Sequence, residues 1–512
     1  MLTNILFEMK NKEIKKLGSI IMSVMKSILL FYIIVANTSA IAQKIENKIE
    51  TKLDSIVINS AIDFDIPGVS VGIVKNMEVI YLKNYGVKNV ITQEPVSSGT
   101  IFNMGSISKV FTATAIMQLF ERGLVDISTP VHKYVPYFSL KNQNYKKITV
   151  EHLLTHSSGL PGDHSAYRGK PYFGDDAIKK YIISLYDRDI EFTPGEKYSY
   201  SNTGFVLLSA LIEEVTKTKF EEYMWKNLLE PMGMENSTFD ANKKGTDNLT
   251  ARHVIGPDFS NAVLENDPGT RWNTGAGGLS SNVNDMCLFA QTLINNGSIG
   301  NNQILSKKSL EMMWKKKENT GDKGFAWSVY NVWDGKKLVD HGGNSIGYSA
   351  ELALMPDDSL AVIVFCNNRN GAEWPIAGAI LKTILGIELR KPKYYPDYYV
   401  QKKLREEGPD SALLFLRKTL DEDKDEVSCY DMMLLAYRVI QGGGEKNLEI
   451  SKTIYELLAE YFPDNPMVND MLGEIYFKLA IKQYRELIKK DPTSWTGKKM
   501  LELLENVNID FY

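Results

Sequence analysis

Apolar residues follow two spacings along this chain, and the pattern changes near residue 400. Before that point, apolar runs and alternating segments are separated by turns rich in glycine and proline, which indicates strands mixed with helices. The alternating segment 349–355 and the apolar run 360–366 are joined by a Pro-Asp-Asp turn, so they predict a hairpin. Residues 373–385 then predict a helix that packs against the same sheet.

A mostly apolar segment after Gly105 contains no glycine or proline until Gly123, which predicts a buried helix. Ser106 and Lys109 lie at its start, three residues apart, and therefore on one face. Burial in apolar surroundings favours a neutral amine, which can take the proton of a nearby hydroxyl and make it a nucleophile. The exposed N–H groups of the helix start favour developing negative charge at Ser106. An N-cap serine followed by a surface lysine would give the same pattern.

A second polar group precedes the apolar run at residues 205–212. A Pro-Gly turn leads into a short extended piece, and a helix is predicted to start near Asn202 or Thr203. In an extended piece, Tyr200 and Asn202 project to the same side. The phenol can relay protons and the amide can bind a substrate carbonyl. The alternative is an ordinary capped helix start with a packed tyrosine.

A third polar group, His341-Gly342-Gly343-Asn344, comes just before the predicted strand at 349–355. Two adjacent glycines allow another backbone, or a substrate, to lie close against a strand. The alternative is a glycine bulge with an incidental histidine.

Together these motifs, Ser-x-x-Lys, Tyr-x-Asn and a third strand motif, resemble those of the serine β-lactamase and penicillin-binding protein superfamily in order and separation. The chain is most similar to the class C β-lactamase-like branch, which includes D-stereospecific peptidases and esterases. The resemblance covers about residues 50–390 and extends to segments 66–74, 152–161 and 275–281. It implies an α+β fold, in which an antiparallel sheet flanked by helices adjoins an all-α domain.

The resemblance also implies catalytic roles. Ser106 would be the nucleophile that forms an acyl-enzyme, Lys109 would accept its proton, and Tyr200 would share proton transfer. The division of base duty between Lys109 and Tyr200 stays open. The backbone N–H groups of Ser106 and Asn344 would form the oxyanion hole. Hydrolysis of this kind needs no cofactor and no metal, and its substrate would be a small molecule or a peptide.

The substrate-binding residues depart from the pattern that is best known in the superfamily. Asn202 would orient the substrate amide or carbonyl, and His341 and Gly343 would border the substrate. The usual Lys-Thr-Gly is here His341-Gly342-Gly343, which replaces a fixed positive charge by a group with a reference pKa near 6.5 and removes a hydroxyl. We therefore expect weak recognition of a terminal carboxylate. Esters, amides and D-amino-acid peptides without that group are favoured over efficient β-lactam hydrolysis.

Other histidines are less informative. His152 and His156 are four residues apart, the spacing of two zinc ligands on a helix, but no glutamate lies between them and a Ser-Ser-Gly-Leu-Pro sequence ends the helix at once. Hydrogen bonds that fix a loop are the favoured interpretation. His132, His164 and His253 follow no pattern and are expected to be solvated or structural.

Composition narrows the remaining choices. The 512 residues, 44% hydrophobic and 24% charged, are enough for at least two domains. The net charge of −4 gives no general attraction to nucleic acid or to an anionic membrane, and no nucleic-acid partner is expected. The three cysteines are an odd number and far apart, which argues against a disulfide framework.

The first 42 residues have the pattern of a signal peptide. Lysines precede an uncharged run, 27–42, which ends in Ala40-Ile41-Ala42, and Met25 is an alternative start. The run is shorter than the roughly 20 residues of a membrane-spanning helix. An uncleaved signal anchor, which would hold the protein at the membrane, is the alternative. Either way, we expect the protein to be exported, to the periplasm or outside the cell.

The chain after residue 390 predicts a separate module. Residues 43–390 form the expected hydrolase domain, 391–399 a linker rich in proline and tyrosine, and 400–512 an α-helical tetratricopeptide-like module. Pro463 and Pro492 end two similar segments 29 residues apart, short of the roughly 34 residues of that repeat. Either the repeat is degenerate, or its two helices are fused or tightly joined near Leu479 and Ala480.

The module could dock a protein partner or simply pack on the hydrolase domain. Two alternatives to hydrolysis also stay open: a non-catalytic penicillin-binding or sensor protein, and a scaffold that works through the helical tail.

Overall fold

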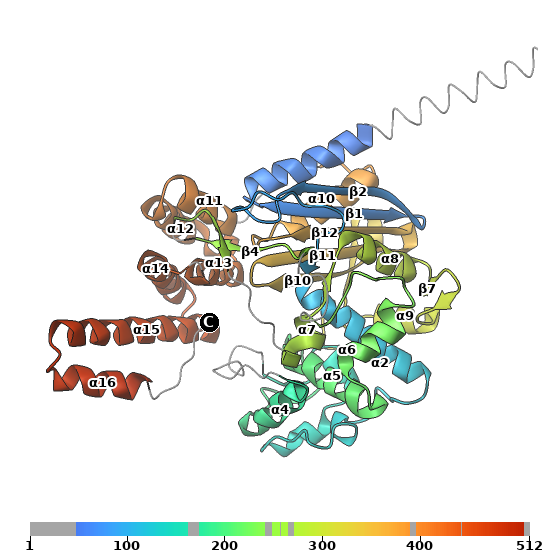
Figure 1. The fold of residues 1–512 in the computed structure, drawn as a ribbon, viewed down its shortest axis with the longest axis horizontal. Helices are drawn as coiled ribbons and strands as arrows, with labels where there is room; N and C mark the ends of the chain where they lie inside the picture. Colours follow the sequence, from blue (N-terminus) through green and yellow to red (C-terminus); the bar gives the residue numbers. More distant parts are fainter. Residues whose placement is uncertain are drawn as a thin grey trace, which may run out of the picture.

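A six-stranded antiparallel sheet forms the centre of the computed structural model, which describes residues 48–161, 174–240, 248–256, 258–264, 271–389, 396–441 and 443–505. The strand order is β2-β1-β12-β11-β10-β9 (Figure 1). The expected signal peptide, Met25 and His164 lie outside the described residues. The strands are β1 (Gly68–Lys75), β2 (Glu78–Gly86), β9 (Ser328–Val332), β10 (Lys336–Ser345), β11 (Tyr348–Met355) and β12 (Leu360–Cys366).

The predicted hairpin is β11 and β12, joined by the turn at Pro356–Asp358. Both faces of β12 are buried, because its alternate side chains enter two different cores. Val362, Val364 and Cys366 point to one core, and Ala361, Ile363 and Phe365 to the other. This explains why the sequence of β12 is a continuous apolar run.

Helices cover both faces of the sheet, as the α+β prediction requires (Figure 1). One face packs against α10 (Glu373–Ile384), the predicted closing helix, and against the helix at residues 48–63. The other face packs against α2 (Ser108–Glu121) and α8 (Val283–Ile294).

A mainly helical region extends from the α2 face of the sheet. Its helices are α3 (Val150–Leu154), α4 (Ala177–Ser184), α5 (Asn202–Thr216), α6 (Phe220–Met224), α7 (Thr274–Gly277) and α9 (Lys307–Met313). The described residues also contain three short strand pairs outside the central sheet: β3 (Phe102–Asn103) with β6 (Ser280–Ser281), β4 (Arg252–Ile255) with β5 (Asn261–Leu264), and β7 (Ser298–Ile299) with β8 (Asn302–Gln303).

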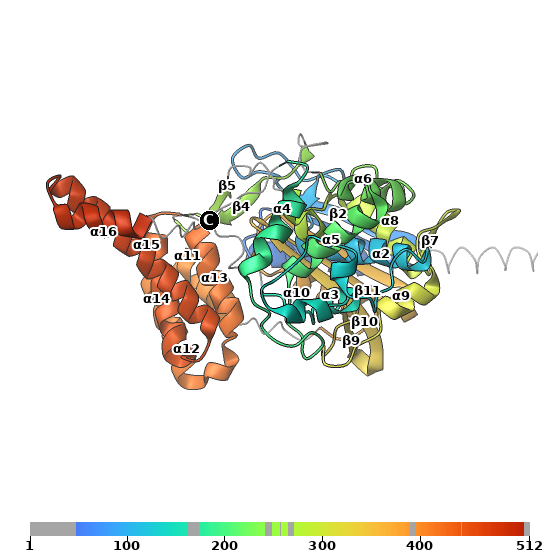
Figure 2. The same cartoon turned by 90° about the horizontal axis from the view of Figure 1, so that it is seen from below.

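The C-terminal residues form a helical module beside the end of the sheet (Figures 1 and 2). Its helices are α11 (Pro396–Glu406), α12 (Pro409–Asp423), α13 (Cys429–Gln441), α14 (Glu445–Tyr461), α15 (Pro466–Lys490) and α16 (Trp495–Glu505). Because α11 begins at Pro396, part of the predicted linker is helical, and Tyr398 packs on Phe64 with ring centroids 4.9 Å apart. α15 is one 25-residue helix through Leu479 and Ala480, as the fused alternative predicts.

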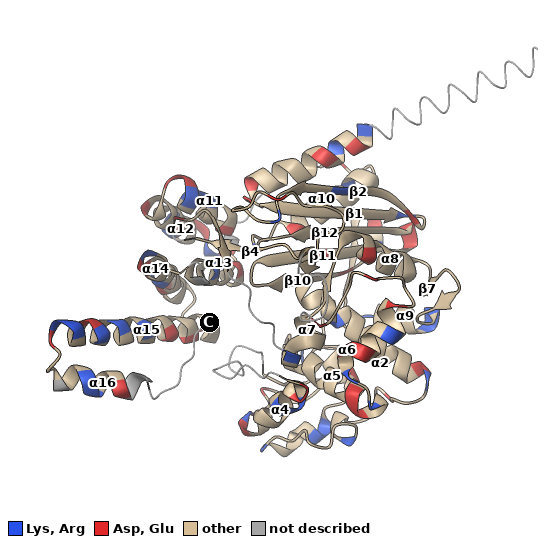
Figure 3. Cartoon of the chain, in the orientation of Figure 1, with Lys and Arg blue, Asp and Glu red and all other residues tan. Residues whose placement is uncertain are grey.

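Lys and Arg side chains and Asp and Glu side chains are both spread over the helices of the module (Figure 3). The three cysteines, Cys287, Cys366 and Cys429, are all free thiols, and the first two are buried. Across the described ranges, no helix combines the length and the apolar character that crossing a bilayer requires.

Candidate active site

Ser106 lies in a single 3-10 turn, η1 (Gly105–Ile107), that leads directly into α2. The turn starts with Gly105 at φ +48°, a conformation that side chains other than glycine rarely adopt. A Cβ on Gly105 would lie 2.7 Å from the backbone nitrogen of Asn344 on β10. This glycine therefore lets the Ser106 turn and the third-motif strand lie in direct contact. The sequence predicted the helix start, but not that Ser106 precedes the α-helix in a tighter turn.

Lys109 occupies the first turn of α2 and is fully buried. Its Nζ donates hydrogen bonds to Ser106 Oγ (3.0 Å), to the Ala276 carbonyl oxygen (2.7 Å) and to Asn202 Oδ1. These acceptors come from three separate elements, η1, α7 and α5. Together they aim the amine at the serine oxygen, so the predicted pairing of the two side chains is present.

Tyr200 approaches Ser106 from the other side. Its hydroxyl donates to Ser106 Oγ at 2.7 Å, and the centroid of its ring is 4.9 Å from Lys109 Nζ. Ser106 Oγ thus lies between an amine and a phenol, each of which can exchange a proton with it. With 37% of its surface exposed, Tyr200 forms part of the open side of the site.

Asn202 is the first residue of α5, after Ser201, whose hydroxyl caps the helix by accepting from the Gly204 N–H. Tyr200 and Asn202 point to the same side, as the extended backbone predicts. Asn202 Oδ1 accepts a hydrogen bond from Lys109 Nζ, so the amide oxygen is engaged by the lysine. Asn202 therefore also helps to orient the lysine, which the sequence did not indicate.

The third motif lies on β10, next to the Ser106 turn. A Cβ on Gly343 would overlap the Met104 carbonyl oxygen, so the predicted close approach is to another backbone. His341 and Gly343 face the same side of the sheet, and Asn344 is exposed beside Gly105. The structure thereby brings the other six predicted site residues close to the Ser106 turn.

His341 holds a neutral ring. Burial, and then the positive charges of Lys109 and Lys323, lower the pKa of His341 to about 3. Its Nδ1 lies 2.5 Å from the Gly342 carbonyl oxygen. The ring thus supplies no positive charge to a substrate carboxylate at neutral pH, in agreement with the expectation from the sequence.

His156 has a larger part in the site than the sequence indicated. Its backbone carbonyl accepts from the Ser199 N–H (2.8 Å), and its Nδ1 accepts from the Ser201 N–H (3.0 Å). Its ring stacks on Tyr200, with centroids 4.4 Å apart and planes at 23°. Burial, and then the charge of Lys109, hold the pKa of His156 well below its usual value, so the ring is neutral. The loop-fixing interpretation is confirmed, and the fixed segment is the one that carries Tyr200.

The other histidines within the described ranges have structural surroundings. His152 Nδ1 accepts from the Thr149 N–H at the start of α3, and His253 Nε2 accepts from the Val90 N–H. His132 lies edge-on to Tyr145, with ring centroids 5.9 Å apart. In the described part of the chain, no three His, Cys, Asp or Glu side chains are grouped so that they could hold a metal ion.

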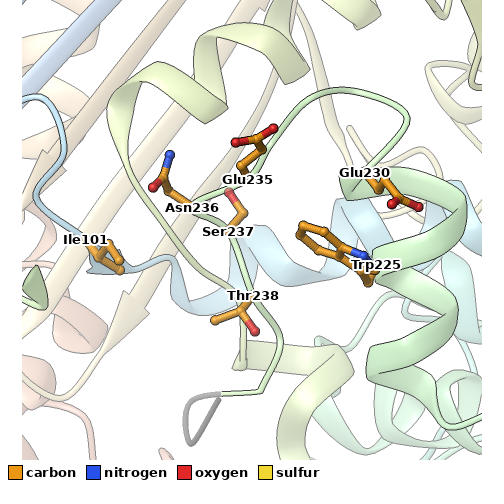
Figure 4. A pocket seen from close by; sticks show the side chains of 7 residues that line it. All are labelled: Ile101, Trp225, Glu230, Glu235, Asn236, Ser237 and Thr238. Atoms are coloured by element: carbon orange, nitrogen blue, oxygen red, sulfur yellow. The ribbon is translucent and has the colours of Figure 1, made fainter. Parts of the chain in front are cut away.

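A cavity of about 510 Å³ lies elsewhere, between the π-helical turn that starts at Trp225 and the irregular segment 235–238 (Figure 4). None of the predicted site residues lines it. The lining residues are Ile101, Trp225, Glu230, Glu235, Asn236, Ser237 and Thr238.

Comparison with known proteins shows which family and which proteins this chain is similar to. Residues 45–381 match the family described as Beta-lactamase. The chain is 26% identical to Protein flp of Staphylococcus aureus (strain N315) over 333 residues, which are 63% of this chain and 64% of that protein. It is 27% identical to Penicillin-binding protein 4* of Bacillus subtilis (strain 168) over 348 residues, which are 64% of this chain and 73% of that protein.

A solved structure is similar as well. The octameric penicillin-binding protein homologue from Pyrococcus abyssi superimposes with a TM-score of 0.59 and 31% identity, over 69% of this chain and 81% of that one. In the sequence comparison, the chain spans less than two thirds of the length of flp. The family match ends before α11, so the C-terminal helical module lies outside it.

Proposed function

Because this chain belongs to the Beta-lactamase family, we propose that it is a serine hydrolase that forms an acyl-enzyme on Ser106. The observation that carries the proposal is the pair of hydrogen bonds that Ser106 Oγ accepts, from Lys109 Nζ at 3.0 Å and from Tyr200 at 2.7 Å. A serine hydroxyl becomes an effective nucleophile only when such a base is within hydrogen-bond reach.

In the proposed acylation step, Ser106 Oγ attacks the carbonyl carbon of the substrate and forms a C–O bond. The hydroxyl proton passes to Lys109 or Tyr200, one of which must be unprotonated beforehand. The carbonyl oxygen becomes an oxyanion, and the backbone N–H groups of Ser106 and Asn344 bind it. One such donor contributes roughly 3–4 kcal/mol to transition-state stabilisation.

Collapse of the tetrahedral intermediate breaks the bond to the leaving group, which takes up the proton held by Lys109 or Tyr200. A water molecule then attacks the acyl carbon, and the same pair removes its proton and returns one to Ser106 Oγ. The acid is released and the free hydroxyl is restored. Tyr200, partly exposed beside Ser106 Oγ, is suitably placed to serve both the leaving group and the water.

The proposed substrates are esters, amides and D-amino-acid peptides that need no terminal carboxylate for recognition. The neutral ring of His341 and the missing side chain of Gly342 remove the charge and the hydroxyl that would bind a carboxylate. Slow turnover of β-lactams follows from the same reasoning.

A second candidate, a non-catalytic penicillin-binding or sensor protein, would need only acylation. The complete contact set around Ser106 Oγ favours turnover, because both proton carriers are in place. We also propose that the enzyme is exported, on the pattern of residues 1–42.

The test is a panel of p-nitrophenyl esters, D-amino-acid amides, D-Ala-D-Ala peptides and nitrocefin, measured with the wild-type protein and with Ser106→Ala. We expect the variant to lose every activity and the ester or amide substrates to rank above nitrocefin. Activity retained by Ser106→Ala would refute the mechanism, and fast nitrocefin turnover would refute the substrate assignment. Labelling of Ser106 by a fluorescent penicillin without product formation would support the sensor alternative.

A further inference from the structure

The C-terminal helical module shares its hydrophobic core with a hairpin of the hydrolase domain. Ile255, at the end of β4, and Phe259, in the connection to β5, are both 7% exposed and lie among the core residues of α11–α15. The fully buried Asn447 on α14 donates its Nδ2 to the Gly256 carbonyl oxygen at 3.2 Å. The tip of this hairpin is therefore held by the module.

The start of the same hairpin, at Thr250 and Arg252, contacts the turn between β10 and β11. A Cβ on Gly347, in that turn, would lie 2.7 Å from Arg252 Cα, the first residue of β4. Next to it, the Tyr348 hydroxyl donates to the Thr250 carbonyl oxygen. Movement of the hairpin would therefore move the β10–β11 turn.

A second contact from the module reaches the same turn by another route. Arg438 on α13 is 7% exposed, and its guanidinium donates to the Arg369 carbonyl oxygen, in the connection between β12 and α10. The carbonyl oxygen of the preceding residue, Asn368, accepts from Ser349 Oγ at 3.0 Å. Ser349 is paired with Asn344 across β10 and β11.

Both routes end within a few residues of Asn344, whose backbone nitrogen lies beside the Ser106 turn. The strand end contains Gly342 and Gly343, and the turn that follows contains Gly347, so three positions there have no side chain to limit backbone motion. Oxyanion stabilisation depends on donors held in place before the reaction. Contacts from neighbouring elements would therefore help to hold the Asn344 N–H in position.

We propose that the C-terminal helical module is a positioning element of the active site, which braces the β10–β11 turn and so holds the Asn344 N–H against the Ser106 turn. This inference rests on the proposed function, since it concerns the same oxyanion hole. It assigns the module a role inside the enzyme, in addition to any surface that it offers to other proteins.

The test uses the full-length chain with four single substitutions and a p-nitrophenyl ester. Arg438→Met removes the donor to Arg369, Arg438→Lys keeps a donor on a long stem, and Asn447→Ala removes the bond to Gly256. The matched control is Arg417→Met, on α12 of the same module, where the arginine is 49% exposed and pairs with Glu460. Active sites are counted by titration with a fluorophosphonate, so that kcat is expressed per functional site.

We expect Arg438→Met and Asn447→Ala to lower kcat per site by about tenfold with KM nearly unchanged, a part of the roughly 10²–10³-fold that loss of one oxyanion donor costs. Arg438→Lys should recover most of the loss, and Arg417→Met should match the wild type. A purely structural role would reduce the number of titratable sites and leave kcat per site intact, which would overturn the proposal.

Wild-type kcat per site in folded Arg438→Met and Asn447→Ala would overturn it as well. If Arg438→Met does not fold, the result for Asn447→Ala decides whether the module has a positioning role.

The Ser106→Ala variant distinguishes failure of the proposed function from failure of this inference. If Ser106→Ala keeps activity, the proposed function is wrong. If Ser106→Ala is inactive and the module variants have normal kcat per site, only the positioning role is wrong.

Discussion

At the scale of single residues, the site is defined by what holds Tyr200 and Lys109 on either side of Ser106. The lysine is directed by acceptors on two other elements, the Ala276 carbonyl and the Asn202 side chain. The tyrosine is directed by His156, whose carbonyl and ring nitrogen bind the residues before and after it. The residue types were evident in the sequence, but the contact between His156 and Tyr200 was not, because no local pattern links positions 44 apart.

Two substitutions of His156 separate its ring from its hydrogen bond. His156→Asn keeps an acceptor for the Ser201 N–H, and asparagine tolerates the positive φ of +55° at this position, but the stacked ring is lost. His156→Phe keeps a ring but leaves the buried Ser201 N–H without its acceptor, which costs about 1–3 kcal/mol. We expect His156→Asn to lower kcat several-fold with a small change in melting temperature, and His156→Phe to lower the melting temperature by several degrees.

Steady-state kinetics and thermal unfolding check this pair, with His132→Asn, next to Tyr145 and away from the site, as the control. An unchanged kcat in His156→Asn would show that the stacked ring has no positioning role for Tyr200.

At the scale of elements, the sequence predicted correctly those strands, helices and turns that short-range patterns determine. β12, β11 and α10 lie within a residue or two of their predicted limits, because alternation, a Pro-Asp-Asp turn and helical spacing are short-range signals. Contacts between distant segments were not predictable in this way. The 3-10 turn at Ser106 depends on β10 lying against Gly105, and the burial of Ile255 and Phe259 depends on helices that begin more than a hundred residues later.

The closeness of β10 to the Ser106 turn can be tested with one methyl group. A Cβ on Gly343 would overlap the Met104 carbonyl oxygen, so Gly343→Ala must push the strand away from η1. We expect the free energy of unfolding to fall by about 1–3 kcal/mol, as for other overpacked sites, and kcat to fall with it. Denaturant unfolding and ester hydrolysis measure the two effects.

Gly378→Ala is the matched control, because a Cβ at this position of α10 would meet no atom within 4 Å. Replacing a glycine inside a helix by alanine should leave activity unchanged and add up to about 1 kcal/mol of stability. Equal stability and activity in Gly343→Ala and the wild type would mean that the two backbones are not in contact.

At the scale of the whole molecule, the two faces of the sheet differ: one carries the candidate site and the other carries a group of buried carboxyl side chains. One face carries His341, Gly343 and the helices around Ser106, and the other carries Asp340 and Glu351, buried near Glu373 at the start of α10. Burial is the first cause that raises the pKa of each of these three carboxyl groups. Because these three carboxyl groups titrate differently in the folded and the unfolded chain, the free energy of unfolding depends on pH.

Asp340 allows the direction of this dependence to be tested. Burial raises the pKa of Asp340 from its usual value near 3.8 to about 6, against the opposing effects of the Ser328 hydroxyl and the Lys323 ammonium. Between these two values, the folded protein keeps a proton that the unfolded chain has lost, so the contribution of Asp340 to stability falls as pH rises. Over the whole window this amounts to about 3 kcal/mol at most.

Asp340→Asn removes the titration and keeps a polar side chain beside Ser328. We expect its free energy of unfolding, relative to the wild type, to improve steadily from pH 4 to pH 6, whereas Asp357→Asn, exposed in the β11–β12 turn, should run parallel to the wild type. Urea unfolding at half-unit pH intervals gives both curves. The lowered pKa values of His156 and His341 make stability rise with pH in the wild type and in both variants alike, so their effect cancels in the comparison. Glu351 does not cancel, because the Asp340 charge helps to raise its pKa, and it changes the curve in the same direction as Asp340. A difference curve for Asp340→Asn that is flat between pH 4 and pH 6 would mean that Asp340 is ionised at its buried position throughout.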